Sequence, residues 1–414
     1  MNRVIFGVNE IRPKLALGWE FLQDYQLARI RGAGTAAAER GWELSPFALF
    51  RTGQEHHRAV NDELSGMQYL LSGERASDRE WKRACDEAVW SYLQRTRPAV
   101  IAYPGYASRE SSVMRSWATA HGAAIVIMFE TQRADRARGL LREFFKRRCL
   151  EGIDAAISGG VAHASYLAQL GLPLERQALF YDVVDNERFS QPSPNRRGAD
   201  EKFFLFVGRF IEKKGIALLL ESFGDSRREV VENGGVPWRL TLVGDGPLRQ
   251  RLLERSAELG LTEFVEFRGY LDAHAVASAL RQANCLVVPS IGEEQWGLVL
   301  NEGCAAGLPI IASDACGAHF DLLTHHYNGL LVRKGDRADL TRALTFAQLE
   351  PVQMELFGTR GRRIVDSFNC DRFGHALLNA GQLAREYSRK RAPWRRRFQG
   401  TLERLGRKVG IFGG

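Results

Sequence analysis

Two glutamates around a predicted strand-to-helix loop have a spacing that suits a ligand with an anion between two hydroxyl-bearing ends. Glu294 lies in a polar loop after the apolar run 285–289, and Glu302 follows with seven residues between them. At about 1.5 Å per residue, a helix would place the two carboxylates roughly 10 Å apart. The backbone N–H groups of residues 297–299 fall between them, where a helix start favours an anion such as a diphosphate. A nucleotide sugar has this layout.

The neighbouring residues predict that this loop belongs to a βαβ unit. The run 285–289 is typical of a buried parallel strand, and a helix is expected to begin at Trp296. Residues 307–309 end that helix, and residues 310–312 form the next apolar strand. Open α/β sheets bind ligands outside the carboxyl ends of their strands, so we expect a binding site at this loop. The competing interpretation is an ordinary βαβ unit with two surface carboxylates.

Four short motifs in this stretch occur at the spacing of a known donor site. They are Pro289-Ser290, Glu294-Gln-Trp-Gly297, Asn301-Glu302-Gly303 and Gly307-Leu-Pro309. Together they resemble the signature of the retaining GT-B glycosyltransferases, the large "glycosyl transferases group 1" family. The family's usual Glu-Ala is Glu-Gly in this chain. The resemblance implies an α/β protein with two Rossmann-like domains facing a cleft, and a nucleotide diphosphate-sugar donor such as a UDP- or GDP-sugar.

The resemblance also implies roles for individual residues. Glu294 would bind the donor-sugar hydroxyls and Glu302 the ribose, while Arg209 and Lys214 would hold the diphosphate. A dianionic leaving group needs two fixed cations, although a charged surface turn is the competing interpretation for this pair. Asp321 stands where the family usually has the Glu of a Gly-Gly-x-x-Glu motif. The predicted donor-binding residues are Gly208, Tyr270, Gln295, Trp296, Gly297, Leu298, Glu302 and Asp321.

The first half of the chain alternates apolar strands with helices, which predicts a doubly wound domain on the acceptor side. Glu130 follows the apolar strand 123–129 and is a candidate catalytic residue facing the donor sugar. Tyr103, Arg109 and Arg133 are expected to line the acceptor side. No G-x-G-x-x-G follows the first predicted strand, which disfavours a nicotinamide or flavin dinucleotide.

No metal or other cofactor is expected. The two cations and the helix start would replace a metal ion at the diphosphate, and no Asp-x-Asp motif stands at a strand end. The pair His56-His57 has no third ligand in view, so we interpret it as part of a solvated loop.

Periodicity predicts the elements of both domains. The expected strands are 3–7, 42–50, 99–103, 123–129, 155–158, 179–184, 203–207, 239–243, 265–267, 285–289, 310–312 and 328–332, with a loop at 12–18. The expected helices are 21–40, 74–95, 111–121, 133–150, 216–223, 296–306, 338–349, 355–368 and 373–389.

Length and composition indicate a two-domain globular protein. The chain has 414 residues, 45% hydrophobic and 26% charged. We expect an N-terminal domain at 1–189, a proline-rich linker at 190–200, a nucleotide-sugar-binding domain at 201–370, a helix at 371–391 that crosses back, and a basic tail at 392–414. Six scattered cysteines and the lack of an apolar leader or spanning segment favour a reduced, cytoplasmic protein.

Basic residues gather in two regions of a chain whose net charge is +8. The first comprises Arg133, Arg136, Arg138, Arg142, Lys146, Arg147 and Arg148; the second spans residues 389–397. The tail also carries apolar residues at helical spacing, namely Trp394, Phe398, Leu402, Leu405, Ile411 and Phe412. These features favour peripheral binding to an anionic membrane surface and a glycan acceptor linked to lipid, with no nucleic-acid partner. A disordered, solvated tail and a soluble acceptor are the alternatives.

Two other functions are compatible with this architecture. A sugar-nucleotide epimerase or a phosphorylase would use a similar fold, but no free-phosphate pocket or pyridoxal phosphate lysine is evident. A non-enzymatic, basic membrane-surface protein could also retain the fold. Intact Glu294, Glu302, Arg209 and Lys214 argue against that interpretation.

Overall fold

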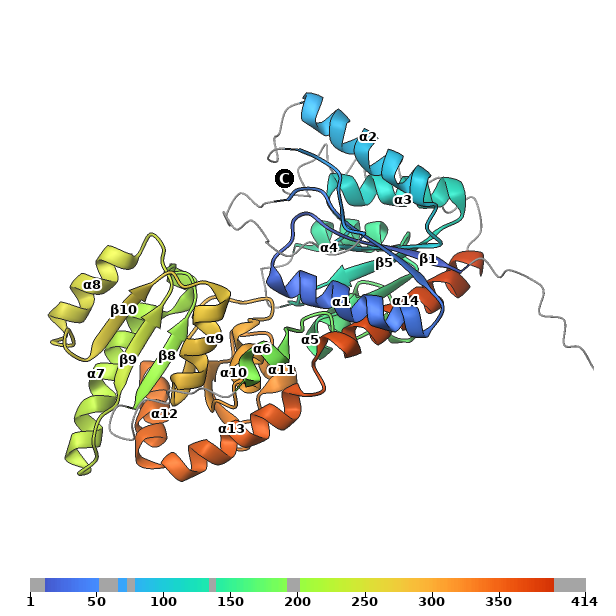
Figure 1. The fold of residues 1–414 in the computed structure, drawn as a ribbon. Coiled ribbons are helices and arrows are strands. Elements are labelled where there is room, and N and C mark those ends of the chain that lie inside the picture. The colour runs from blue at the N-terminus through green and yellow to red at the C-terminus, as the bar shows by residue number, and fades with distance from the viewer. Residues whose placement is uncertain (1–11, 52–65, 73–78, 134–138, 192–201, 391–414) are drawn as a thin grey trace, which may run out of the picture.

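The computed structural model describes residues 12–51, 66–72, 79–133, 139–191 and 202–390, which form two α/β domains (Figure 1). Within these residues the first domain contains a seven-stranded sheet in the order β3-β2-β1-β4-β5-β6-β7. All of its strand pairs are parallel. Its strands are β1 (Lys14–Trp19), β2 (Glu43–Ala48), β3 (Gln68–Tyr69), β4 (Val100–Pro104), β5 (Ala124–Phe129), β6 (Ala155–Ser158) and β7 (Gln177–Ala178). Its helices are α1 (Asp24–Glu39), α2 (Arg79–Thr96), α3 (Arg109–His121), α4 (Leu140–Leu150), α5 (Val161–Gln169) and η2 (Leu174–Arg176). The short helix α6 (Asn186–Ser190) follows in the crossing and packs against helices of the second domain.

The second domain repeats this plan with a parallel six-stranded sheet in the order β10-β9-β8-β11-β12-β13 across the described residues. Its strands are β8 (Phe203–Val207), β9 (Arg239–Val243), β10 (Val265–Gly269), β11 (Cys285–Val288), β12 (Ile310–Ser313) and β13 (Gly329–Val332). The helices that follow in the chain are η3 (Glu212–Lys214), α7 (Ile216–Glu232), α8 (Arg249–Glu258), α9 (Ala273–Gln282), α10 (Val299–Ala305), α11 (His319–Leu322), α12 (Arg337–Leu349), α13 (Pro351–Val365) and α14 (Cys370–Lys390).

The central strands are apolar along their whole length because helices cover both faces of each sheet. β5 reads AIVIMF and β11 reads CLVV, and every residue of both strands is buried. In the second sheet the strand order reverses between β8 and β11. That reversal is the switch point where open α/β sheets bind ligands. The two predicted donor motifs follow β8 and β11, the strands on either side of it.

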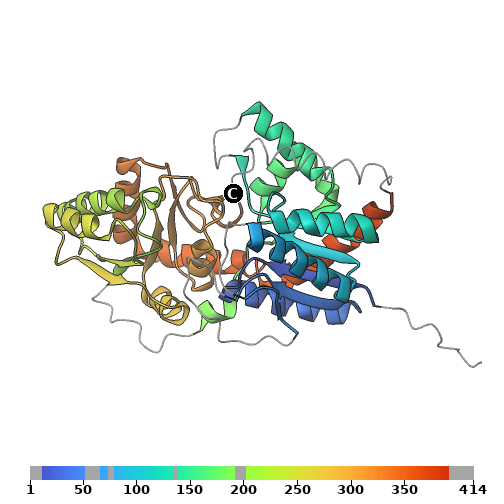
Figure 2. The same cartoon turned by 90° about the horizontal axis from the view of Figure 1, so that it is seen from above.

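The last helix, α14, lies with the first domain although it follows the second in the chain (Figures 1 and 2). It packs against α1 and the first sheet, and two glycines let the backbones touch. A Cβ on Gly374 would lie 2.3 Å from the Gly32 carbonyl oxygen, and one on Gly32 would lie 2.1 Å from that of Cys370. The close α1–α14 contact therefore depends on these two positions having no side chain.

The predicted doubly wound α/β class is confirmed, but several segments differ from the prediction, two of them in the first half of the chain. Residues 14–19, all but the last of which fall in the predicted loop 12–18, form the central strand β1. Residues 179–184 form an irregular crossing between the domains rather than a strand. In that crossing Phe180 has a φ of 76°, which interrupts extended pairing. The predicted strand 3–7, His56-His57 and the tail 392–414 lie outside the described residues, as do linker residues 192–200.

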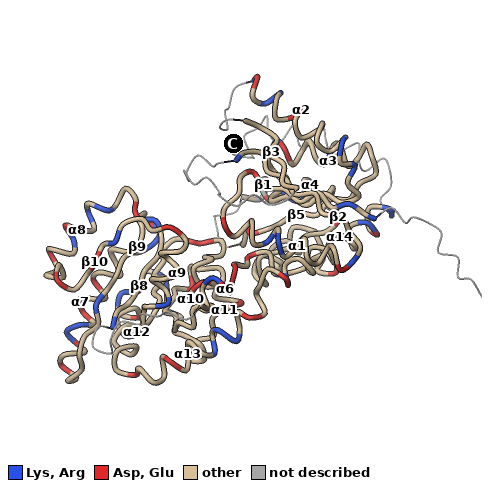
Figure 3. Tube along the Cα trace, viewed as in Figure 1, with Lys and Arg blue, Asp and Glu red and all other residues tan. Residues whose placement is uncertain are grey.

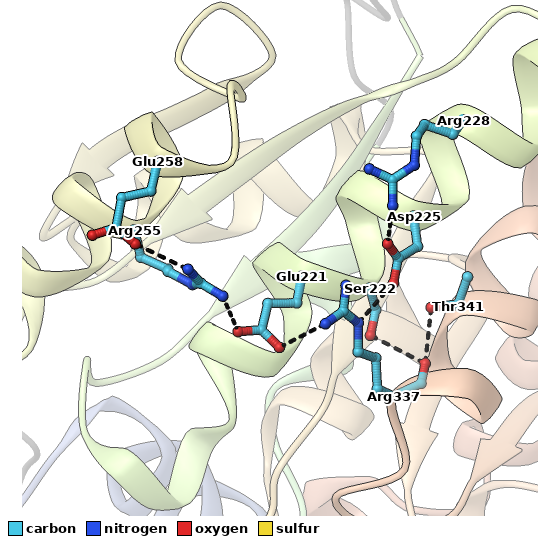
Figure 4. A network of polar contacts seen from close by, with 8 residues as sticks. All are labelled: Glu221, Ser222, Asp225, Arg228, Arg255, Glu258, Arg337 and Thr341. Carbon is cyan, nitrogen blue, oxygen red and sulfur yellow. Dashed lines mark hydrogen bonds and ion pairs between the residues drawn. The ribbon is translucent and has the colours of Figure 1, made fainter.

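Charged residues are mixed over the outer helices, whereas most strand residues carry no charge (Figure 3). One network on the second domain joins α7, α8 and α12 (Figure 4). Glu221 accepts from Arg255 at 2.6 Å and from Arg337 at 3.3 Å, and Arg337 also binds Asp225 at 2.7 Å. The network ties three surface helices together without contacting the predicted donor loop. None of the described helices is long and apolar enough to cross a membrane.

Gly374→Ala should destabilise the protein, because the added methyl group would force α14 away from α1. Overpacking of this kind typically costs about 1–3 kcal/mol, which exceeds the helix-propensity gain of alanine. Gly34→Ala is the matched control: it lies in α1, but the nearest atom to its new Cβ would be 3.9 Å away. Thermal unfolding should show a lower midpoint for Gly374→Ala and an unchanged or higher one for Gly34→Ala. Equal midpoints would contradict the role assigned to the glycine contact.

Candidate active site

The donor loop, residues 290–298, follows β11 and is held against the segment after β12. The Glu294 N–H donates to the Ala315 carbonyl at 2.9 Å, and the Gly317 N–H donates to the Glu294 carbonyl at 3.1 Å. Gly317 must be a glycine here, because a Cβ would lie 2.0 Å from the Gln295 carbonyl oxygen. The backbone around Glu294 is therefore fixed by its own domain.

A tight turn brings Lys214 to the Glu294 carboxylate. Gly215 has a φ of 67° and its backbone approaches so closely that a Cβ would lie 2.1 Å from the Pro289 carbonyl oxygen. The Ile291 N–H donates to the Lys213 carbonyl at 2.9 Å, which joins this turn to the donor loop. As a result, Lys214 Nζ lies 2.7 Å from Glu294 Oε2, with side-chain exposures of only 16% and 7%.

The second Glu294 carboxylate oxygen accepts a hydrogen bond from the Ser290 hydroxyl. Both oxygens of this buried acid are thus satisfied inside the second domain, as a buried charge requires. Arg209 lies in the same group of loops, after Gly208, and its side chain is exposed. A Cβ on Gly208 would come within 3.6 Å of Lys214 Cε, so the lysine stem passes beside this glycine. The structure brings Gly208, Lys214 and Glu294 together.

The helix after the donor loop begins later than the sequence predicts. It starts at Val299, because Gly297 has a φ of 97° and packs so that a Cβ would lie 2.5 Å from Cys316 Sγ. Gly297 and Leu298 therefore precede α10, and the predicted start at Trp296 is wrong. Leu298 is the N-cap residue of α10.

Glu302 stands in α10 and is half-buried. Enclosure by protein raises its pKa from 4.5 to about 7, partly opposed by the Arg188 guanidinium. Glu130, at the end of β5 in the first domain, and Glu302 both act on the Tyr25 hydroxyl, whose pKa is raised to about 12 mainly by burial. Both carboxyl groups therefore lie within electrostatic range of Tyr25.

The junction also contains a fully buried ion pair. Arg29 Nη2 lies 3.5 Å from Asp182 Oδ1, and Arg29 Nε donates to the Val183 carbonyl at 3.1 Å. Burial, followed by the charge of Glu130, raises the pKa of Asp182 well above its ordinary value. Asp182 Oδ2 has no hydrogen-bond partner among the described residues. This carboxyl group is therefore biased towards its protonated form.

Three groups of the first domain bind the second domain at the donor loop and beside it. Gln132 Nε2 donates to the Glu294 carbonyl at 2.9 Å, and His163 Nε2 contacts the Gln295 carbonyl at 2.9 Å. The Val161 N–H donates to the Asp321 carboxylate at 3.1 and 3.2 Å. Burial raises the Asp321 pKa to about 6 and lowers the His163 pKa to about 4. Asp321, predicted to bind donor, instead joins the two domains in this structure.

Gln132 and His163 were not predicted to be site residues. Gln132 lies in the short segment after β5 in which Glu130 and Arg133 were considered, and His163 follows the two glycines that close β6. Both positions lie near the carboxyl ends of parallel strands, which is the signal that could have identified them.

Several predicted side chains lie elsewhere. Trp296 is 3% exposed, donates to Asn301 at 2.7 Å and packs beside His163 in the domain junction, so its indole does not face an open site. Tyr103 is buried and its hydroxyl donates to Glu110 at 3.3 Å, so it does not line an open acceptor surface.

The remaining predicted residues are at least partly accessible. Arg109 is held by Asp86 at 2.7 Å. Arg133 is exposed and contacts Gln169 at 3.1 Å. Tyr270 is 61% exposed, and the Gln295 side chain is also exposed.

Comparison with known families identifies the second domain. Residues 187–363 match the family "Glycosyl transferases group 1", and this segment contains both predicted donor motifs. The chain carries a glycosyl transferases group 1 domain. In this glycosyltransferase domain, the Lys214–Glu294 pair and Glu302 all lie inside the matched residues.

Curated relatives match over part of their length. The chain is 34% identical over 169 residues to a phosphatidyl-myo-inositol mannosyltransferase from Mycobacterium leprae, covering 41% of this chain and 43% of that protein. It is 33% identical over 187 residues to the lipopolysaccharide core biosynthesis glycosyltransferase LpsD from Rhizobium meliloti, covering 44% of this chain and 50% of that protein. The chain thus spans about half the length of these relatives or less.

Solved structures extend the likeness to the whole fold. HepE from Anabaena, crystallised in complex with UDP and glucose, matches with a TM-score of 0.66 and 15% identity. The match covers 88% of this chain and 98% of HepE. The two parallel-sheet domains of this chain therefore have the predicted GT-B fold.

Glu302 should make the stability of the protein fall between weakly acidic and neutral pH. The folded protein keeps a proton up to about pH 7, whereas the unfolded chain loses it near pH 4.5. The stabilisation is fully present below pH 4.5 and is lost as the pH rises through 7, with an upper limit of about 3 kcal/mol. Glu302→Gln removes this group, so its unfolding free energy relative to wild type should rise from pH 4.5 to pH 8. A difference that does not change with pH would contradict the raised pKa.

Proposed function

We propose that the protein is a retaining glycosyltransferase that moves a hexose from a nucleotide diphosphate-sugar, such as a UDP- or GDP-sugar, to a glycan acceptor. The observation that carries the proposal is Glu294, whose carboxylate is held by Lys214 at 2.7 Å in the loop between β11 and α10. This loop lies within the matched glycosyltransferase family, and the structurally similar HepE was crystallised with UDP and glucose. Glu302, on the following helix α10, supplies the second carboxyl group.

The proposed reaction uses charge at the leaving group. Lys214 and Arg209 neutralise the diphosphate as the bond between the sugar and the phosphate breaks, which is electrostatic stabilisation of developing charge. Glu294 binds the donor-sugar hydroxyls and Glu302 binds the ribose. The acceptor hydroxyl forms the new bond on the same face of the sugar, and its proton passes to the departing phosphate. The chain then supplies positioning and charge, and we propose that neither a metal ion nor a cofactor is required.

The Lys214–Glu294 contact also indicates how the donor would enter. Without a ligand, the lysine neutralises Glu294, which is 7% exposed. Donor binding would give Lys214 a phosphate oxygen and give Glu294 sugar hydroxyls, so neither charge is left without a partner. The pair thus holds both groups in place before the substrate arrives.

Enzyme assays separate this function from its alternatives. Purified protein with UDP- and GDP-sugars and a set of glycan acceptors should release nucleoside diphosphate and form a glycoside. An epimerase would change the donor sugar without acceptor, and a phosphorylase would need free phosphate. A purely non-enzymatic protein would give no product in any of these reactions.

Arg209→Ala should lower turnover at least a hundredfold, because one oriented cation at the leaving group contributes roughly 3 kcal/mol. Lys213→Ala is the matched control, since it also removes a cation from the same group of loops. Arg209 is exposed, so thermal stability should not change. Lys214→Ala should lower turnover similarly, but it also leaves buried Glu294 without its cation. Near-normal turnover of Arg209→Ala and Lys214→Ala would exclude the diphosphate assignment.

Excess EDTA should leave wild-type turnover largely intact, because the proposed mechanism uses no metal ion. Loss of turnover in EDTA would contradict the metal-independent mechanism.

We further propose that the acceptor is linked to lipid and that the cytoplasmic protein binds the inner membrane surface peripherally. The support lies on α4 in the first domain. Its Leu141 is 73% exposed and Phe144 is 49% exposed, and the neighbouring Arg147 and Arg148 are also exposed. Exposed apolar side chains beside cations suit an anionic lipid surface. One curated relative is named a phosphatidyl-myo-inositol mannosyltransferase, and another a lipopolysaccharide core biosynthesis glycosyltransferase.

Full-length protein should sediment with vesicles that contain anionic lipid, and less so as salt is raised. Leu141→Ser combined with Phe144→Ser should weaken this binding, as should deletion of residues 392–414. Val352→Ser is the control, because Val352 is 80% exposed but lies on α13 of the second domain. If wild-type protein ignores anionic vesicles at low salt, the membrane proposal is wrong, while the transfer reaction is unaffected.

A further inference from the structure

Two side chains of the first domain end on consecutive carbonyl groups of the donor loop. Gln132 Nε2 donates to the Glu294 carbonyl at 2.9 Å, and His163 Nε2 lies 2.9 Å from the Gln295 carbonyl. Gln132 is 4% exposed and His163 is fully buried. Buried donors of this kind are costly to leave unsatisfied, so both favour the domain contact that gives them acceptors.

The direction of the His163 contact is fixed by its other ring nitrogen. The Gly160 N–H donates to His163 Nδ1 at 3.1 Å, so Nδ1 carries no proton. Nε2 must then carry the ring hydrogen and donate it to the Gln295 carbonyl. One neutral imidazole thereby joins the start of α5 to the donor loop.

The contact of Gly160 with the second domain leaves no room for a side chain at this position. A Cβ on Gly160 would lie 2.2 Å from Asp321 Oδ2 and 2.6 Å from the Trp296 ring. The N–H of the next residue, Val161, donates to the same Asp321 carboxylate. The backbone of the first domain therefore rests directly on Trp296, the residue after Gln295, and on Asp321 in α11.

These hydrogen bonds hold the backbone of Glu294, from which the carboxylate side chain extends. The second domain binds the Glu294 N–H through Ala315 and its carbonyl through Gly317. The first domain adds Gln132 to that same carbonyl and His163 to the next one. With both ends of the Glu294–Gln295 unit fixed, rotation that would swing the carboxylate away from the sugar is opposed from both domains.

We infer that Gln132 and His163 are positioning residues through which the first domain sets Glu294 for the donor sugar. This inference rests on the proposed function for its kinetic consequence, but its structural part does not. The nucleoside diphosphate would contact Arg209, Lys214 and Glu302, all in the second domain. Loss of the two bonds should therefore reduce sugar transfer without weakening bare nucleotide binding.

Two substitutions of His163 separate positioning from helix capping. His163→Asn keeps an acceptor close to the Gly160 N–H but is too short to reach the Gln295 carbonyl. His163→Gln can place an amide donor near the position of Nε2. Gln132→Ala removes the other hydrogen bond, so the effects of the two bonds can be measured separately. His121→Asn is the control, because His121 lies in the same domain, at the exposed end of α3.

The first measurement is hydrogen–deuterium exchange of the full-length protein. Peptides covering residues 290–298 should exchange at least threefold faster in Gln132→Ala and His163→Asn than in wild type. His163→Gln should restore most of the protection, and His121→Asn should match wild type. Peptides from β9 should be unchanged in every variant. Unchanged exchange of the donor loop in both Gln132→Ala and His163→Asn would overturn the inference whether or not the protein is an enzyme.

The second measurement is kinetic. kcat should fall about tenfold or more in Gln132→Ala and His163→Asn, with His163→Gln recovering most of it. The affinity for UDP or GDP alone should stay within twofold of wild type. Wild-type kcat in both deficient variants would refute the positioning role, as would equal losses in kcat and nucleotide affinity. An inactive wild-type protein would instead count against the proposed function, and the exchange experiment would still decide the structural inference.

Discussion

The Glu294 carboxylate is the group on which the candidate site depends, because a buried charge needs a partner at each oxygen. Lys214 and Ser290 provide those partners, and both stand on loops that follow central strands of the second sheet. Lys214 reaches the carboxylate only because Gly215 turns the chain against the Pro289 carbonyl. The strand order places β8 beside β11, so the two loops emerge at the same sheet edge. The pairing of one lysine with one glutamate thus follows from sheet topology and a single left-handed glycine.

The domain junction also contains two acids whose pKa values are raised. Burial raises the pKa of Glu302 to about 7 and that of Asp182 well above its ordinary value. An ionised carboxylate would repel the phosphates of the proposed donor, whereas a protonated one can donate a hydrogen bond. Lys214 stands at the end of η3, and Arg209 stands in the loop between β8 and η3. Protonation of Glu302 would therefore remove a negative charge from the proposed nucleotide site.

The sequence predicted most of the longer strands, including the partly polar β9, but it missed β1. β8, FFLFV, was predicted to the residue, because nothing polar interrupts it. Most of β1 was predicted to be a loop, although its Gly18 is covered by the Phe47 ring, which would lie 2.1 Å from a Cβ. Glu294 and Lys214 belong to motifs that local spacing reveals. Gln132 and His163 bind backbone carbonyls 162 and 132 residues away in the chain. Because every residue has a backbone carbonyl, the sequence contains no motif that indicates such an acceptor.

The same distinction explains how the two domains can share one site. A carbonyl group accepts a hydrogen bond whatever side chain its residue carries, so Gln295 can keep an exposed side chain while its carbonyl binds His163. The constraint falls instead on the positions without side chains: Gly160 beneath Asp321 and Trp296, and Gly317 beside Gln132 and the Gln295 carbonyl. A methyl group at either position would separate the surfaces by more than a hydrogen bond tolerates. The backbone of the donor loop is therefore fixed by contacts from both domains that do not depend on its exposed side chains.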